Sequence, residues 1–241
     1  MIAYALVLAV GLLAGLVSGI VGTGATIILL PVLTLVFGPK AAIPIMAVVA
    51  LMLNFAKITS WWREIDWRAT AAYALGGIPG AALGARTMLS LPPRLVDLSL
   101  GCFFLIMIPA RHWLARRHYK VALWVLVPAG LAIGFLTGIV VSTGPITVPL
   151  FSAYGLMKGA FIATEAAASL AVYISKATTF RSFGALPTDI VLKGLITGSS
   201  VMAGTYLSRL LLERLSLRAF QYLLDIVMVL SGLALLWAAM R

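Results

Sequence analysis

The chain has 241 residues, of which 62% are hydrophobic and only 10% are charged. A soluble domain carries about 25% charged residues, and the apolar segments here leave no room for a separate soluble domain. The composition therefore excludes a water-soluble protein and predicts an integral membrane protein. The apolar runs are long and do not alternate, which predicts helical spans rather than the short alternating strands of a membrane barrel.

The net charge of +11 would suggest a nucleic-acid partner in a soluble protein. In a membrane protein it is typical of cytoplasmic loops rich in Lys and Arg, so no nucleic acid is expected. Attraction of an anionic substrate is the alternative interpretation. The single cysteine, Cys102, forms no internal disulfide and lacks the spacing of a metal site. Neither a Walker-type loop nor a Ser-His-Asp, zinc or haem pattern occurs, so no enzyme, cofactor or metal is predicted.

The first apolar run covers residues 2–37, which is longer than the about 20 residues of one membrane crossing. Small residues from Gly22 to Gly24 interrupt it and predict two helical arms. The expected helical segments of the first half are 2–20, 25–37, 41–62, 66–89 and 95–113.

A basic segment from Arg111 to Lys120 separates this half from a second one with the same plan. The expected segments there are 121–141, 145–154, 159–180, 187–212 and 217–240. The halves superpose at an offset of 119 residues, which places Gly11, Gly15 and Gly19 on Gly130, Gly134 and Gly138, Ser18 on Thr137, and Lys57 on Lys176. We therefore predict a first transmembrane repeat (1–115), a basic linker (116–120) and a second repeat (121–241).

Each half crosses the membrane an odd number of times, whether its first helix pair crosses fully or turns back as a re-entrant hairpin. The second half then enters from the opposite side. The predicted fold is an all-α membrane protein of two inverted repeats, each a broken or re-entrant helix pair followed by three transmembrane helices. More Lys and Arg fall on the side of the linker, which predicts a multi-pass membrane protein with a cytoplasmic linker and both termini outside.

The two breaks are the candidate binding site. A helix start offers unpaired backbone N–H groups and the positive end of the helix dipole, and glycine allows a ligand close to the backbone. Two such starts facing each other predict a cradle for a small oxyanion. The alternative is that the glycines serve only for close packing or as hinges. The first break contributes Gly22, Thr23, Gly24, Ala25 and Thr26, and the second contributes Ser142, Thr143 and Gly144.

Polar residues inside the following spans extend this site. Lys57 and Lys176 occupy matching places, and Asn54 and Tyr173 precede them by three residues on the same helix face. The lysines either flank an anion path or reach the headgroups as interfacial anchors. Glu165 lies well inside a span, and it either carries a coupled proton or sits near a helix N-terminus for structural reasons.

The glycine-rich breaks resemble those of the TauE/SafE family of sulfite and organosulfonate exporters. The resemblance rests on Gly11-Leu-Leu-Ala-Gly15, Gly19-Ile-Val-Gly22-Thr-Gly24 and Pro31, with a second copy from Gly134 to Pro149. It covers nearly the whole chain in length, segment order and duplication. Thr23 and Ala25 interrupt the usual glycine run, which leaves the choice of anion open. The resemblance implies export of sulfite, sulfoacetate or a related sulfur-containing anion across the inner membrane.

The sequence thus predicts a secondary transporter that exports a small sulfur-containing oxyanion by alternating access. A channel-like anion pore, or transport of another anion such as thiosulfate or sulfate, is the alternative. A membrane-embedded accessory or enzyme subunit is disfavoured because no catalytic pattern occurs. The expected partners are the anion and the lipid bilayer, with a homo-oligomer left open.

Overall fold

The computed structural model describes residues 2–21, 24–115, 120–140 and 143–211, with single positions at 229, 233, 236, 237 and 240. This part of the chain is helical and contains no strand. Its helices are α1 (Ile2–Val21), α2 (Ala25–Phe37), α3 (Pro39–Trp61), α4 (Trp67–Ser90), α5 (Pro93–Ala115), α6 (Leu126–Val140), α7 (Gly144–Tyr154), α8 (Lys158–Ser182) and α9 (Thr188–Leu211), with 3-10 turns η1 (Trp62–Glu64) and η2 (Leu123–Val125).

Three segments of the described chain are long and apolar enough to cross a membrane, namely Lys40–Glu64, Leu123–Val140 and Thr188–Ser208. Tyr4–Gly19 and Ile28–Phe37 are apolar but shorter. With 13 and 11 residues, α2 and α7 extend only about 20 and 17 Å at 1.5 Å per residue. Because the hydrocarbon core of a bilayer is about 30 Å thick, neither of these two helices is long enough to cross it alone.

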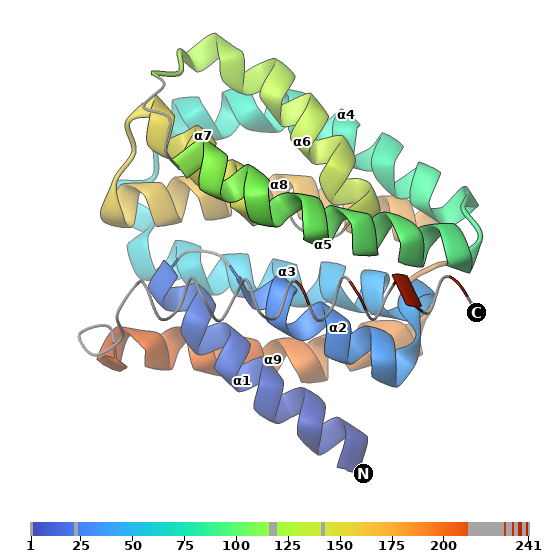
Figure 1. Ribbon diagram of the computed structural model, residues 1–241. Helices are drawn as coiled ribbons and strands as arrows, with labels where there is room; N and C mark the ends of the chain where they lie inside the picture. The colour runs from blue at the N-terminus through green and yellow to red at the C-terminus, as the bar shows by residue number, and fades with distance from the viewer. Residues whose placement is uncertain are drawn as a thin grey trace.

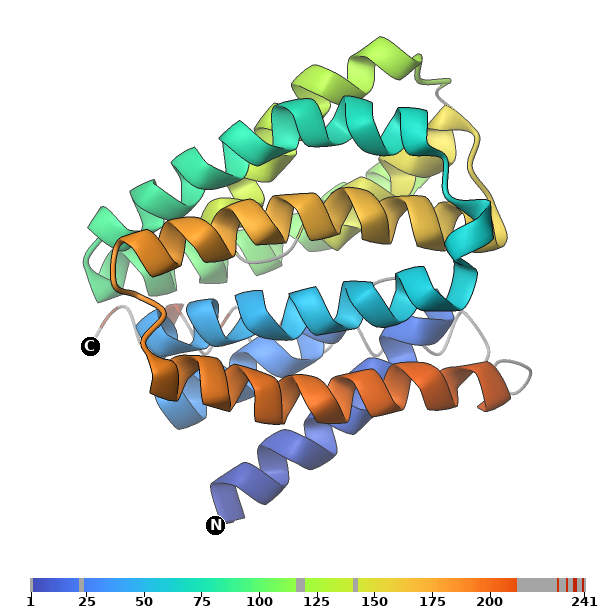
Figure 2. The ribbon, with the colours of Figure 1, turned by 180° about the vertical axis from the view of Figure 1, so that it is seen from behind.

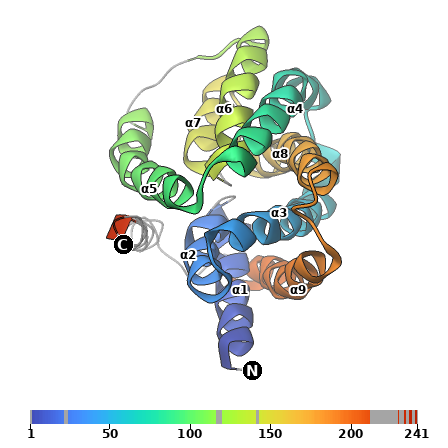
Figure 3. The same cartoon turned by 90° about the vertical axis from the view of Figure 1, so that its right-hand side faces the viewer.

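Four long helices lie side by side in the order α4, α8, α3, α9, which Figure 2 shows from top to bottom. On the other face, α6 crosses α4 at one end of this layer and α1 crosses α9 at the other (Figure 1). The short helices α2 and α7 belong to the same face as α1 and α6, and α5 stands at the edge of the bundle beside α7 (Figure 3). Each half of the chain therefore packs its first helix against the fourth helix of the other half.

Glycine sets how closely these crossing helices approach. A Cβ atom added at Gly15 would collide with the backbone carbonyl of Val201, and one added at Gly80 with that of Leu131. Small residues at such contacts let two helix backbones approach within van der Waals distance. At two contacts, the backbone of the facing helix lies where a Cβ atom on the glycine would be. These glycines are Gly15 and Gly204 at the α1–α9 contact, and Gly76, Gly80, Gly84, Gly130, Gly134 and Gly138 at the α4–α6 contact.

Asp66 fixes the start of α4 against the second half. Its Oδ1 accepts hydrogen bonds from the backbone N–H groups of Arg68 (2.9 Å) and Ala69 (3.0 Å), which is N-capping. The Asp66 N–H donates to Thr164 Oγ1 of α8 at 2.9 Å, and Tyr154 OH at the end of α7 donates to Asp66 Oδ2 at 3.3 Å. One acidic residue therefore joins α4, α7 and α8.

Most helix boundaries agree with the sequence-based expectation within a few residues. The expected segment 121–141 differs, because it begins with the 3-10 turn Leu123–Val125 before α6 starts at Leu126. The last expected segment, 217–240, lies almost entirely outside the described residues, as do linker positions 116–119.

Candidate functional site

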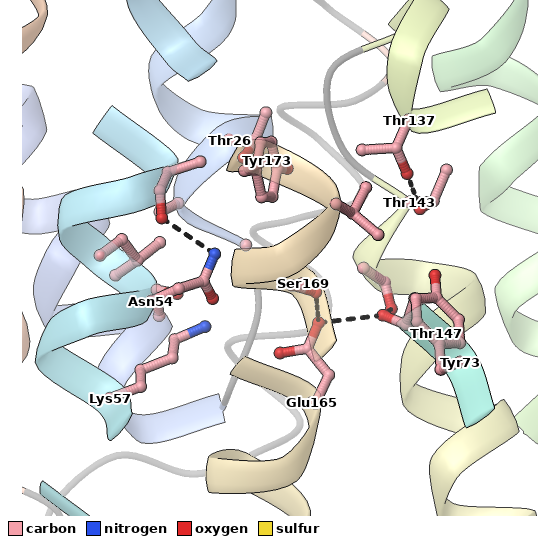
Figure 4. A pocket seen from close by; sticks show the side chains of 17 residues that line it. Thr26, Asn54, Lys57, Tyr73, Thr137, Thr143, Thr147, Glu165, Ser169 and Tyr173 are labelled. Atoms are coloured by element: carbon pink, nitrogen blue, oxygen red, sulfur yellow. Dashed lines mark hydrogen bonds between the residues drawn. The ribbon is translucent and has the colours of Figure 1, made fainter. Parts of the chain in front are cut away.

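A cavity of about 40 Å³ lies between the two halves, with room for roughly three water molecules or one small oxyanion. The starts of α2 and α7 both border it (Figure 4). Its walls are formed by Ser18, Gly24, Ala25 and Thr26 of α1–α2, by Ala50, Leu53, Asn54 and Lys57 of α3, by Tyr73 of α4, by Thr137, Thr143, Gly144 and Thr147 of α6–α7, and by Glu165, Ser169, Val172 and Tyr173 of α8.

Two helix starts open on this cavity. The residue before α2 is Gly24, whose φ of 112° lies in the left-handed region that favours glycine. The residue before α7 is Thr143, whose side chain makes no capping hydrogen bond to the first turn of that helix. Because the first N–H groups of a helix carry the positive end of its dipole, both starts present a partial positive charge to the cavity.

The α3 wall supplies an ammonium and an amide. Lys57 and Asn54 are each only 4% exposed, although they are polar residues in an apolar helix. Asn54 Nδ2 donates to the carbonyl of Ala50 at 2.9 Å, which orients the amide. Both side chains reach from α3 toward α8 (Figure 4). A buried ammonium beside two helix starts favours an anion at this position.

The opposite wall carries a carboxylate. Glu165 of α8 is 6% exposed, and its Oε1 accepts hydrogen bonds from Ser169 Oγ (2.9 Å) and Thr147 Oγ1 (3.3 Å). Figure 4 shows the other carboxylate oxygen directed toward the α3 wall. The cavity therefore holds one basic and one acidic side chain, on facing walls.

Ser18 is the buried hydroxyl in this site that lacks a partner. Its side chain is fully buried and lines the cavity, and its Oγ makes no hydrogen bond within the described part of the chain. At the matching place in the second half, Thr137 Oγ1 donates to the carbonyl of Ile133 (2.8 Å) and shares a hydrogen bond of 2.6 Å with Thr143 Oγ1. A buried hydroxyl without a hydrogen-bond partner costs free energy, so the Ser18 hydroxyl favours a ligand in the cavity that would form this hydrogen bond.

Lys176 differs from Lys57 despite its matching place in sequence. It is fully buried, and its Nζ donates to the backbone carbonyl of Thr137 at 2.6 Å. The ammonium also lies 5.4 Å from the centre of the Phe180 ring. Lys176 is not part of the cavity wall, so its ammonium serves to join α8 to α6.

The structure brings most of the predicted site residues together. At the cavity wall lie Gly24, Ala25, Thr26, Asn54, Lys57, Thr143, Gly144, Glu165 and Tyr173. Lys176 lies outside the wall, and Gly22, Thr23 and Ser142 lie outside the described residues. The sequence reading missed several lining residues, namely Ser18, Tyr73, Thr137, Thr147 and Ser169.

Two of the missed residues carried a usable signal. Ser18 and Thr137 are hydroxyl residues at matching places of the two halves. Tyr73 carried none, because α4 meets the cavity only through tertiary packing. In the described part of the chain, no cluster of three His, Cys, Asp or Glu side chains could hold a metal ion.

A family comparison agrees with this geometry. The family model described as sulfite exporter TauE/SafE matches residues 7–235, nearly the whole chain. No curated protein and no solved structure matches. Members of this family are membrane transporters of sulfite or related anions, not enzymes. With its family match spanning both halves, the chain belongs to the sulfite exporter TauE/SafE family.

Proposed function

We propose that this protein exports sulfite or a compact organosulfonate across the inner membrane, and that the anion binds in the cavity between the starts of α2 and α7. The observation that carries the proposal is the convergence of donors on one buried space. The starts of α2 and α7, the ammonium of Lys57 and the hydroxyl of Ser18, which has no partner among the described residues, all border a cavity of about 40 Å³. A cavity of this size has room for a small sulfur oxyanion.

Alternating access is the mechanism that we propose for this site. The reciprocal packing of α1 on α9 and α4 on α6 supports two inverted repeats, 1–115 and 121–241, around a common cavity. Buried lining residues support a carrier rather than an open pore, because Ser18, Lys57 and Glu165 are at most 6% exposed. Rocking of one half against the other would open the cavity to each side in turn.

The proposed orientation places the linker at 116–120 in the cytoplasm and both termini outside, from the distribution of Lys and Arg. An inside-negative potential then assists export, by about 2.3 kcal/mol per charge for each 100 mV. The oligomeric state is left open by this proposal.

Flux into proteoliposomes tests the function. We expect saturable uptake of sulfite that is accelerated by sulfite trapped inside the vesicles, since counterflow is a property of a carrier. The panel includes sulfoacetate, thiosulfate, sulfate and chloride. Unsaturable, ohmic chloride current would favour the channel alternative, and no transport of any sulfur oxyanion would refute the substrate class.

Ser18→Ala tests the location of the binding site. Removal of one neutral hydrogen bond costs about 0.5–1.5 kcal/mol, so we expect the apparent affinity for sulfite to fall by about 2- to 10-fold. Ser199→Ala is the matched control, because Ser199 is exposed on α9 and its hydroxyl donates to the carbonyl of Ile196 at 2.7 Å. Equal affinity in the two variants would place the anion elsewhere.

A further inference from the structure

Glu165 is a carboxylate in a cavity built for an anion. It lies two turns inside α8, seven residues after Lys158, so the dipole at the start of the helix does not explain it. At the matching place in the first half stands Met46, which is fully buried. The helical frame therefore does not require a carboxylate at this level. An ionisable side chain buried in a membrane helix is by default functional.

The hydrogen bonds of Glu165 leave one oxygen for a ligand. Ser169 Oγ and Thr147 Oγ1 both donate to Oε1, at 2.9 and 3.3 Å. Oε2 accepts no hydrogen bond from the described residues and is directed toward the α3 wall (Figure 4). When Oε2 carries a proton, it donates to an oxyanion in the cavity; when it is ionised, it repels the same oxyanion.

The charges around the cavity bear on whether Glu165 can carry a proton. Of the titratable side chains that face it, α3 supplies Lys57, α4 supplies Tyr73 and α8 itself supplies Tyr173. The lining residues of α1, α2, α6 and α7 are hydroxyl residues, glycine and alanine. Among the described lining residues, only Lys57 balances the charge of an ionised Glu165, so an added anion leaves these residues with excess negative charge unless a proton enters with it.

We propose that Glu165 takes up one proton when the oxyanion binds and releases it when the anion leaves, so that proton and anion are carried together. This coupling rests on the proposed anion site. The proton comes from a hydronium ion or a buffer acid on the side to which the cavity is open, and its bond to that donor breaks as the O–H bond at Oε2 forms. A sulfite dianion with one proton then moves a single net negative charge per cycle, and a monoanionic sulfonate moves none.

Proton uptake on binding tests the coupling directly. Sulfite is titrated into the purified protein by calorimetry, in two buffers with different ionisation enthalpies, for wild type and Glu165→Gln. The amide side chain of this variant keeps an oxygen that accepts both hydroxyl donors, and the difference between the two proteins cancels the protonation of sulfite itself. We expect wild type to take up more protons per sulfite bound.

The pH dependence gives a second readout. Where one proton enters per anion, the dissociation constant of wild type rises by up to about tenfold per pH unit, and that of Glu165→Gln rises less steeply. Asp189→Asn is the control, because Asp189 is an exposed carboxylate that pairs with Lys193 at 3.2 Å. It should keep the proton uptake of wild type.

The outcomes separate the two proposals. Sulfite binding with equal proton uptake in wild type and Glu165→Gln would overturn the coupling and leave the anion site intact. Absence of sulfite binding by wild type would overturn both. If Glu165→Gln does not fold, wild type is tested with a transported anion that carries no proton of its own at neutral pH, such as sulfoacetate or thiosulfate. An imposed pH gradient, at a membrane voltage clamped to zero, must drive its uptake beyond that of protein-free liposomes, and failure to do so refutes the coupling.

Discussion

Lys57→Met removes the ammonium from the proposed anion site while keeping an apolar chain of similar length. Lys57 is 4% exposed and borders the cavity together with Asn54. A hydrogen bond to a charged group contributes about 1.5–3 kcal/mol, which corresponds to roughly 10- to 150-fold in a dissociation constant. The two helix starts and Ser18 remain in the variant, so binding should weaken by that factor and not vanish.

Equilibrium binding of sulfite to the purified protein measures this effect. Lys193→Met is the matched control, because Lys193 lies on α9 outside the cavity and forms an exposed pair with Asp189. Exposed pairs contribute about 0–1 kcal/mol, and this one has no part in anion binding. An unchanged dissociation constant in Lys57→Met would refute the assignment of the ammonium to the anion and favour a structural role.

Two further predictions concern the frame that holds the site, and thermal unfolding in detergent measures both. Asp66→Ala removes the N-cap of α4 and should lower stability by about 0.5–2 kcal/mol, whereas Asp66→Asn, which retains a capping side chain, should lose much less. Gly80→Leu places a side chain against the backbone of Leu131, so the α4–α6 contact must open at a cost of about 3 kcal/mol or more. Leu83→Ala is the control for Gly80→Leu, because Leu83 lies on the exposed face of α4, and its stability should stay close to that of wild type. Equal losses of stability in Gly80→Leu and Leu83→Ala would refute the close-contact explanation.

The helices were predictable because their signals are local. The break at Gly24 and the cap at Asp66 each depend on a few neighbouring residues, and the structure ends or begins a helix at both. The pairing of α1 with α9 was not predictable, since it joins Gly15 to Val201 across most of the chain. Regularly spaced glycines predict a close helix contact but do not specify the partner. The inverted relation of the two halves stays a prediction.

The residues of the proposed binding site were predictable where they depart from the local sequence pattern. Gly24 and Thr143 interrupt apolar helices, and Lys57 and Glu165 are ionisable residues within apolar spans. Each of these features is unusual in a membrane helix and therefore predicts a functional residue. The sequence around Tyr73 does not distinguish it from an ordinary buried aromatic residue. Only the tertiary packing of α4 places Tyr73 at the cavity. Sequence spacing also cannot tell which lysine of a matched pair reaches a ligand, because that depends on the acceptors nearby.

The difference between the matched lysines has a consequence for release of the anion. A second ammonium group at the cavity, with Lys57 and an ionised Glu165, would give a net charge of +1 and would hold a bound dianion more tightly. In this chain the Thr137 carbonyl accepts from Lys176, and Glu165 faces Lys57, so the lining side chains carry no net formal charge. Transport requires binding that is favourable enough for entry yet weak enough for exit. In the proposed transporter, each half supplies one helix start, and the unequal side chains of the two halves would keep the affinity low enough for the anion to depart.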